Sequence, residues 1–207
     1  MKCLPQLKNA ALLRISGIWG ILAPLFAFAF IFLAIAYYPQ FSWTDNALSD
    51  LGVVPGVTSS LFNSGLIISG IWCLLFAIGL FIFLGESVLG QVGVFVFILA
   101  CLALVAIGLF PESVEPTHYI VSVMFFVLLP ISLLIITGAF WLMGKVRMAV
   151  FTLLVAVAAS SPWVLLFSVR YVSGVAVPEL ASAIAGAVWA VVFGCKMIKG
   201  ASRAKVP

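Results

Sequence analysis

A few polar side chains stand out because most of the chain around them is apolar. The run TDNALSDLG, from residue 44 to residue 52, holds two of the six acidic residues, Asp45 and Asp50. A carboxylate in such surroundings can accept hydrogen bonds, hold a cation or take up a proton, and it needs a partner when it is buried. Taken together, the candidate ligand-binding residues are Asn46, Ser49, Asp50, Asn63, Glu112, His118, Arg170 and Glu179.

The residues around Asp50 predict a short helix. Asp45 can cap the helix, because its carboxylate can accept from the amides two or three residues further on. The helix would cover residues 46–51, and Gly52 would end it in the left-handed conformation. Asp50 then lies where the helix dipole disfavours an anion. We expect Arg170 to pair with Asp50 and hold this loop on the protein, and the alternative that Asp50 is a ligand-binding or catalytic carboxylate stays open.

His118 is the only histidine, and its chemistry depends on a nearby carboxylate. As a general base it would need Glu112, Glu115 or Asp50 within reach, and these acids could also hold a divalent cation through oxygen atoms. A triad of Ser49, His118 and Asp50 is awkward, because adjacent helical side chains diverge. Otherwise His118 is an ordinary hydrogen-bonded residue. One histidine cannot supply a multi-histidine zinc site or a bis-histidine haem, so we expect no metal site and no cofactor.

Two further candidates have simpler structural roles available. The Asn63 amide can join helices or meet the loop backbone, as polar side chains within membranes often do. Glu179 follows Pro178 in the first turn of a predicted helix, where a carboxylate complements the helix dipole. Glu179 could equally pair with Arg170.

The elements that position these residues are membrane spans. Hydrophobic residues make up 65% of the 207 residues and charged ones 8%, against about 25% in soluble domains. Several apolar segments reach the roughly 20 residues that a helix needs to cross a bilayer. We therefore predict an all-α, polytopic integral membrane protein, a six-helix bundle in one domain of residues 1–207. The predicted spans are 15–38, 60–84, 90–110, 118–143, 148–171 and 178–197.

The charges predict how the bundle lies in the membrane. Nine of the ten Lys and Arg residues fall on one side, namely Lys2, Lys8, Arg14, Lys145, Arg147, Lys196, Lys199, Arg203 and Lys205. Only Arg170 falls on the other side, together with every acidic residue except Glu86. Because cytoplasmic loops carry the excess of basic residues, both termini should be cytoplasmic in a multi-pass cell-membrane protein. The net charge of +4 then indicates contact with anionic lipid rather than with nucleic acid.

Two motifs and a histidine carry a resemblance to a known family. Asn46 with Ser49-Asp50-Leu51-Gly52, then Gly108-Leu109-Phe110-Pro111-Glu112, then His118 resemble a family of bacterial and archaeal six-span proteins catalogued as domain of unknown function 998. More distantly, YPQFSWTDNALSDLG followed by LFNSG is similar to a loop and span of the DRAM autophagy modulators, relatives of proteins that remodel GPI-anchor lipids. The resemblance implies an outer loop over a six-helix bundle and a link to lipid, and it transfers no catalytic residue.

Three function classes follow. The favoured one is a membrane protein that binds a lipid or small molecule in an outer polar pocket, with membrane lipids as partners and without demonstrated enzymatic activity. The second is a transporter or channel, in which Pro24, Pro130 and Ser160-Ser161-Pro162 break helices near the middle of the membrane. The third is a structural or assembly protein. The sequence leaves the oligomeric state and the identity of the ligand open.

Overall fold

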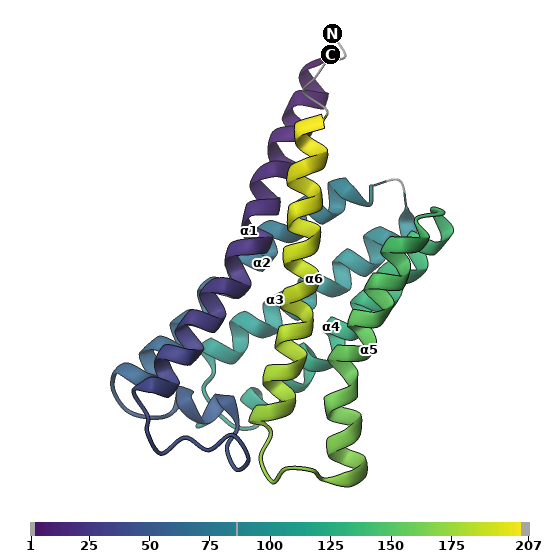
Figure 1. Cartoon of the computed structure of the whole chain (residues 1–207). Coiled ribbons are helices and arrows are strands. Elements are labelled where there is room, and N and C mark those ends of the chain that lie inside the picture. The colour runs from purple at the N-terminus through teal and green to yellow at the C-terminus, as the bar shows by residue number, and fades with distance from the viewer. Residues whose placement is uncertain (1–2, 86, 204–207) are drawn as a thin grey trace.

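The protein is helical throughout the part that the structure describes. The computed structural model describes residues 3–85 and 87–203, which contain six long helices, one short 3₁₀ helix and no strand. The elements are α1 (Cys3–Ala36), η1 (Leu48–Gly52), α2 (Val57–Phe83), α3 (Val88–Leu109), α4 (Thr117–Leu142), α5 (Val146–Val169) and α6 (Ala176–Arg203), shown in Figure 1. All six long helices are long and apolar enough to cross a membrane. The predicted six-span, all-α membrane fold is therefore confirmed.

The observed helices differ most from the predicted spans at the two ends of the chain. Helix α1 begins at Cys3 rather than near residue 15, and α6 continues to Arg203 rather than ending near residue 197. Hydropathy marks only the apolar part of a helix, whereas the backbone hydrogen bonds of these two helices continue through their polar ends. Lys2, Glu86 and Lys205 lie outside the described residues, as do the side chains of Lys8 and Arg203.

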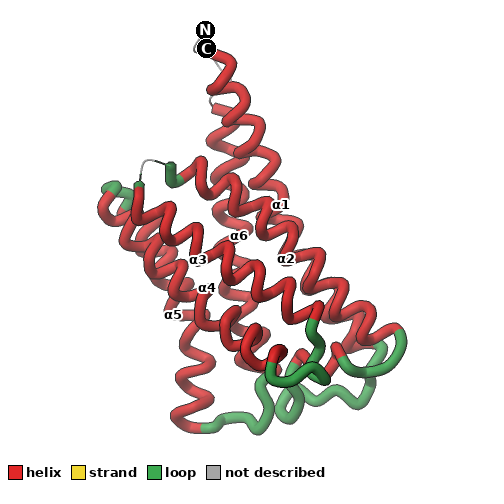
Figure 2. Tube along the Cα trace, turned by 180° about the vertical axis from the view of Figure 1, so that it is seen from behind, coloured by secondary structure: helices red, strands yellow, loops and turns green. Residues whose placement is uncertain are grey.

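The helices are arranged as a ring in chain order. Each helix packs against the next one, and α6 returns to pack against α1. In Figure 1 the first turns of α1 and the last turns of α6 lie side by side at one end of the molecule. Figure 2 shows the connections 37–56, 110–116 and 170–175 together at the opposite end, which we call the loop end.

The α1–α6 contact is close because two glycines face each other. An added Cβ on Gly194 would lie 2.5 Å from the Gly17 carbonyl oxygen, and one on Gly17 would lie 2.6 Å from the Gly194 carbonyl oxygen. The two backbones therefore touch, as small residues permit in membrane helices. From this crossing the two helices separate toward the loop end (Figure 1).

Aromatic side chains fill the interior of the ring on the side away from the loop end. Trp189 is fully buried, with ring centroids 6.0 Å from Phe76, 5.7 Å from Phe97 and 4.7 Å from Phe193. The Trp189 indole N–H donates to the Thr152 hydroxyl at 3.2 Å. This half of the ring is consequently a packed core.

Three prolines lie inside spans without ending them. Pro24, Pro130 and Pro162 fall within the continuous helices α1, α4 and α5. The helix breaks that the transporter alternative uses are therefore not present at these prolines. A membrane helix tolerates proline when its neighbours satisfy the freed backbone group, so the transporter alternative loses its discontinuous helices.

Candidate ligand-binding site

The TDNALSDLG run folds around Asp50 rather than around Asp45. Its helix is the 3₁₀ helix η1, which covers Leu48–Gly52 rather than the predicted residues 46–51. The Asp50 carboxylate accepts from the Asn46 side-chain amide at 2.6 Å and from the Ala47 backbone N–H at 3.1 Å. Asp50 thus does the capping that the sequence assigned to Asp45.

Gly52 is needed for space and not for a left-handed backbone. The φ angle of Gly52 is not positive, so the prediction that Gly52 adopts the left-handed conformation is wrong. An added Cβ on Gly52 would lie 2.6 Å from the Asn63 side-chain oxygen. The Asn63 amide donates to the Gly52 carbonyl at 3.0 Å. Asn63 therefore fixes the end of η1 to α2.

Asp45 joins two loops at the surface. Its carboxylate accepts from the Ser173 hydroxyl at 2.6 Å, from Ser42 at 2.5 Å and from Thr44 at 2.8 Å. These hydroxyls, Ser173 first, lower the pKa of Asp45 to about 2. The Gly174 backbone N–H donates to the Thr44 carbonyl at 2.6 Å in the same place. The connection 170–175 is thereby fastened to the loop that precedes η1.

Arg170 lies apart from Asp50, which corrects the predicted ion pair. Among the ion pairs and hydrogen bonds of the described residues, none joins Arg170 to Asp50 or to Glu179. Arg170 caps the end of α5 in the left-handed region, with φ of 46°, and is exposed. It lines a surface groove with Thr44, Tyr171 and Ser173. Charge complementarity suggested the pair, but the Asp45 contacts place Arg170 on another part of the loop end.

Glu179 is the side chain that connects η1 to α6. Its carboxylate accepts from the Leu48 backbone N–H at 2.6 Å, a bond between residues 131 positions apart. Glu179 is 7% exposed, and Leu48 and Leu51 are buried beside it. The predicted first-turn position of Glu179 is correct, but its partner is the backbone of η1.

Glu112 brings a second carboxyl group to Asp50. Partial burial, and then a hydrogen bond to Asp50 together with the charges of Asp50 and Glu115, raise the pKa of Glu112 to about 7. A nearby negative charge and burial both disfavour the ionised form of a carboxyl group. The loop end therefore holds one carboxyl group, that of Glu112, whose charge changes near neutral pH.

We expect Glu112 to make the protein less stable as the pH rises. The pKa of Glu112 is raised by folding from 4.5, so its contribution is complete below about pH 4.5 and is lost as the pH passes 7. Screening by solvent reduces this contribution to about 1 kcal/mol, equivalent to a fall in Tm of roughly 2–4 °C. Thermal unfolding of purified protein between pH 5 and pH 8 measures the effect. Glu112→Gln should flatten the dependence of Tm on pH, and Glu115→Gln should leave that dependence unchanged. An unchanged slope in Glu112→Gln would show that Glu112 is not its source.

His118 is held by groups other than carboxylates. Its Nδ1 lies 2.7 Å from the Phe110 carbonyl oxygen, so this nitrogen carries the proton and donates. Its Nε2 lies 3.3 Å from the Ser122 hydroxyl. The triad with Ser49 and Asp50 is not formed. His118 instead fastens the start of α4 to the end of α3.

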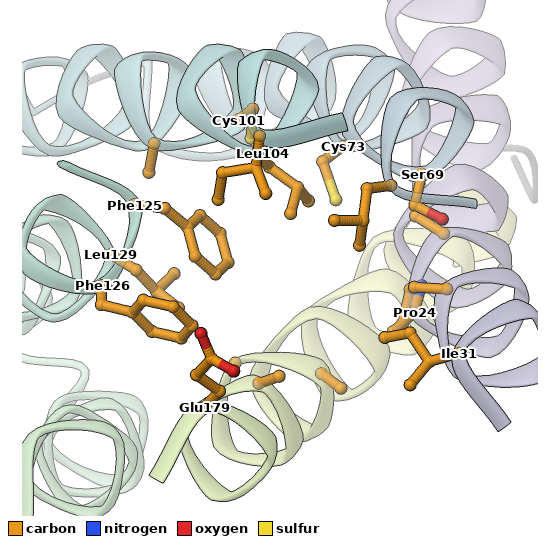
Figure 3. Close-up of a pocket in the computed structure, with 18 of the residues that line it drawn as sticks. Pro24, Ile31, Ser69, Cys73, Cys101, Leu104, Phe125, Phe126, Leu129 and Glu179 are labelled. Carbon is orange, nitrogen blue, oxygen red and sulfur yellow. The ribbon is translucent and has the colours of Figure 1, made fainter. Parts of the chain in front are cut away.

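Below η1 the ring of helices encloses a cavity of about 130 Å³. Figure 3 shows the Glu179 carboxylate pointing into it, with Pro24 and Ile31 of α1, Cys101 and Leu104 of α3, and Phe125 of α4 around it. Helix α6 contributes one face, at Glu179, Ala183, Gly186, Ala187 and Ala190. Glu179 and Ala190 are eleven positions apart along α6, which corresponds to about 16 Å of depth. Leu48 and Ser49 of η1 also line the cavity.

The comparisons with known proteins agree with the family resemblance. The family model described as "Protein of unknown function (DUF998)" matches residues 21–196, which is most of the chain. The chain belongs to the DUF998 family. No curated protein and no solved structure matches this DUF998 chain. The similarity to the DRAM proteins and a prokaryotic origin stay predictions.

Most of the predicted site residues of this DUF998 protein do gather at the loop end. Ser49 and Asp50 belong to η1, and around it lie Asn46, Asn63, Glu112 and Glu179. His118 lies at the start of α4, against the end of α3. Arg170 lies in the separate surface groove. Across the described ranges, no three His, Cys, Asp or Glu side chains are placed to hold a metal ion.

Sequence reasoning missed the cavity and the polar groups in its wall. Ser69 of α2 lines it, is 1% exposed and has no hydrogen-bond partner for its hydroxyl. Ser122 of α4 lines it too. The helical spacing of cavity residues such as Phe62, Leu66, Ser69 and Cys73 marks an inward face, but hydropathy cannot tell a packed face from a hollow one.

Proposed function

We propose that this DUF998 protein binds one aliphatic chain of a membrane lipid, with the polar end of that lipid near η1. The observation that carries the proposal is the cavity with Glu179 at its edge. Apart from a few polar groups its wall is apolar, and a dry apolar cavity of about 150 Å³ is known to take a molecule the size of benzene. The cavity therefore suits a narrow apolar group better than a bulky solute.

The depth of the cavity supports a lipid chain. The face of α6 that lines it spans about 16 Å, which is half of the roughly 30 Å hydrocarbon thickness of a bilayer. A chain from one leaflet would reach from the loop end to the aromatic core around Trp189. The aromatic cluster would then act as the floor of the site.

The cavity wall also suggests how a chain would enter from the membrane. Pro24, Ala27 and Phe28 of α1 and Ala183 and Ala187 of α6 line it and are half-buried. These two helices separate toward the loop end (Figure 1). Small residues on α6 leave room beside α1, so we propose entry from the lipid between these helices.

We further propose that the loop end faces outward and that both termini are cytoplasmic in the cell membrane. Lys145, Arg147, Lys196 and Lys199 lie at the end away from η1, as the positive-inside rule requires of the cytoplasmic side. The bound lipid would then come from the outer leaflet. We propose binding without catalysis, since Ser49 and His118 share no hydrogen bond.

Filling the cavity tests the proposal. Ala187→Phe should place a large ring in the chain's position and reduce co-purifying lipid by about 5- to 150-fold, because overpacking a site costs about 1–3 kcal/mol. Mass spectrometry of purified protein measures the bound lipid.

Val188→Phe is the matched control, since Val188 adjoins Ala187 but is 47% exposed on the outside of α6. It should leave bound lipid unchanged. Equal lipid in both variants would overturn the proposal, and solute flux in proteoliposomes that Ala187→Phe abolishes would favour a transporter instead.

A further inference from the structure

We propose that the surface groove beside Arg170 binds the phosphate group of a membrane glycerophospholipid. This groove is separate from the cavity, because no residue lines both of them. Binding there would not depend on the proposed chain-binding function. It would be a second contact with lipid at the loop end.

The groove passes from apolar to charged side chains where α5 leaves the membrane. Leu166 and Phe167 line it from the end of α5, and Phe167 is 78% exposed. The candidate membrane span of α5 ends at Val169, and Arg170 follows directly. Figure 1 shows this end of α5 and its connection to α6 at the loop end. A phospholipid changes in the same order, from acyl chains in the hydrocarbon core to a phosphate at its surface.

Arg170 has a charge that the described chain leaves without a partner. Its side chain is exposed, and within residues 3–85 and 87–203 its guanidinium takes part in no hydrogen bond or ion pair. The neighbouring carboxylate of Asp45 instead accepts from the hydroxyls of Ser42, Thr44 and Ser173. A guanidinium presents a planar set of N–H donors that can bind a phosphate group through two hydrogen bonds at once. The groove therefore offers a cation of the type that phosphate groups prefer.

Backbone N–H groups in the same turn provide further donors. Tyr171, Val172 and Ser173 all line the groove. Within the described chain their backbone N–H groups donate to no other residue, whereas the next one along the chain donates to the Thr44 carbonyl. Successive N–H groups beside a left-handed residue form a concave site that suits an anion. This turn and the Arg170 side chain can therefore bind one phosphate group together.

The backbone of Arg170 is strained. Its φ of 46° makes it the one non-glycine residue of the described chain with a positive φ. The left-handed region favours glycine, which has no Cβ to clash there. Backbone strain of this kind is concentrated at binding and catalytic sites. Glycine would end α5 with less strain, so this position suits a side chain that serves binding.

Photo-cross-linking tests whether a phospholipid occupies the groove. Full-length protein in maltoside micelles is incubated with a phosphatidylglycerol that has a diazirine in one acyl chain, or with the diacylglycerol that has the same chains. Mass spectrometry of peptides then quantifies the labelling of residues 163–175. We expect the phospholipid to label this segment about fivefold more, the factor that corresponds to the attraction of one arginine near a membrane surface.

Substitutions at residue 170 separate the charge from the backbone. Arg170→Gly and Arg170→Asn both remove the guanidinium and suit a left-handed backbone. Each should abolish the preference for the phospholipid, and Arg170→Gly should leave the Tm unchanged or raise it. Arg170→Lys keeps the charge and should keep most of the preference. Arg147→Asn is the matched control, because Arg147 is an exposed arginine at the other end of the same helix. It should leave labelling of the groove unchanged.

Three outcomes would overturn the proposal. The first is equal labelling by the phospholipid and the diacylglycerol, or a preference that survives both Arg170→Gly and Arg170→Asn. The second is a lower Tm in these variants with unchanged labelling, which would show that Arg170 serves only to end α5. The third is full competition by millimolar inorganic phosphate, which would show that the groove binds free phosphate instead of a lipid. None of these results bears on the cavity, which Ala187→Phe tests separately.

Discussion

Gly194→Ala is expected to destabilise the protein by about 1–3 kcal/mol or more, the range for overpacking a close contact. The added methyl group would meet the Gly17 carbonyl oxygen at 2.5 Å. That atom belongs to the backbone of α1 and cannot rotate away as a side chain can. The α1–α6 contact would have to open, and this contact closes the ring. Thermal unfolding in detergent should show the lower Tm.

Gly200→Ala provides a matched control on the same helix. Gly200 also lies in α6, but an added Cβ there meets nothing within 4 Å. Removing a helical glycine should stabilise the protein by about 0.5–1 kcal/mol. The two substitutions are chemically identical and should shift the Tm in opposite directions. A Gly194→Ala protein at least as stable as the wild type would show that the helices do not touch at this point.

Glu179→Ala should release η1 from α6. The buried Leu48 N–H would lose its acceptor, at a cost of about 1–3 kcal/mol. Hydrogen exchange of residues 47–52 should become faster, because the amides of η1 would open more often. Glu179→Gln should be much milder, since its side-chain oxygen can still accept.

Glu115, an exposed acid in the adjoining loop, provides the control for Glu179→Ala. Glu115→Ala removes a carboxylate of the same kind at an exposed position. It should leave exchange across η1 unchanged. If Glu179→Ala also leaves exchange unchanged, the contact between Glu179 and Leu48 does not hold η1 in place.

Two carboxylates determine how η1 is held at the loop end. Asp50 shapes η1 through Asn46 and Ala47, and Glu179 fastens η1 over the cavity. Glu179 also lines the cavity in which we propose that a lipid chain binds. In the proposed function, Glu179 therefore both borders the ligand's site and holds η1 over it.

The sequence alone determined the six spans and which end of the helix bundle carries most of the basic residues. Bilayer thickness fixes how long an apolar helix must be, so unbroken stretches such as residues 90–110 are recognisable without tertiary information. The sequence also placed Asp50, Glu112 and Glu179 at the same end of the bundle, because each lies in or beside a connection between spans at that end. The chain's membership of the DUF998 family follows from the sequence as well.

Only the tertiary structure decided which of these groups meet. The expected Asp50–Arg170 pair followed from charge alone, but Arg170 lines a separate surface groove with Ser173, whose hydroxyl bonds Asp45. The bond from Leu48 to Glu179 links positions 131 residues apart, which no local pattern encodes. The cavity is likewise a property of packing, since some residues, such as Phe97 and Leu129, belong both to its wall and to the core cluster that contains Trp189. Side-chain volumes around the closed ring, rather than hydropathy along the chain, decide where that interior is left open.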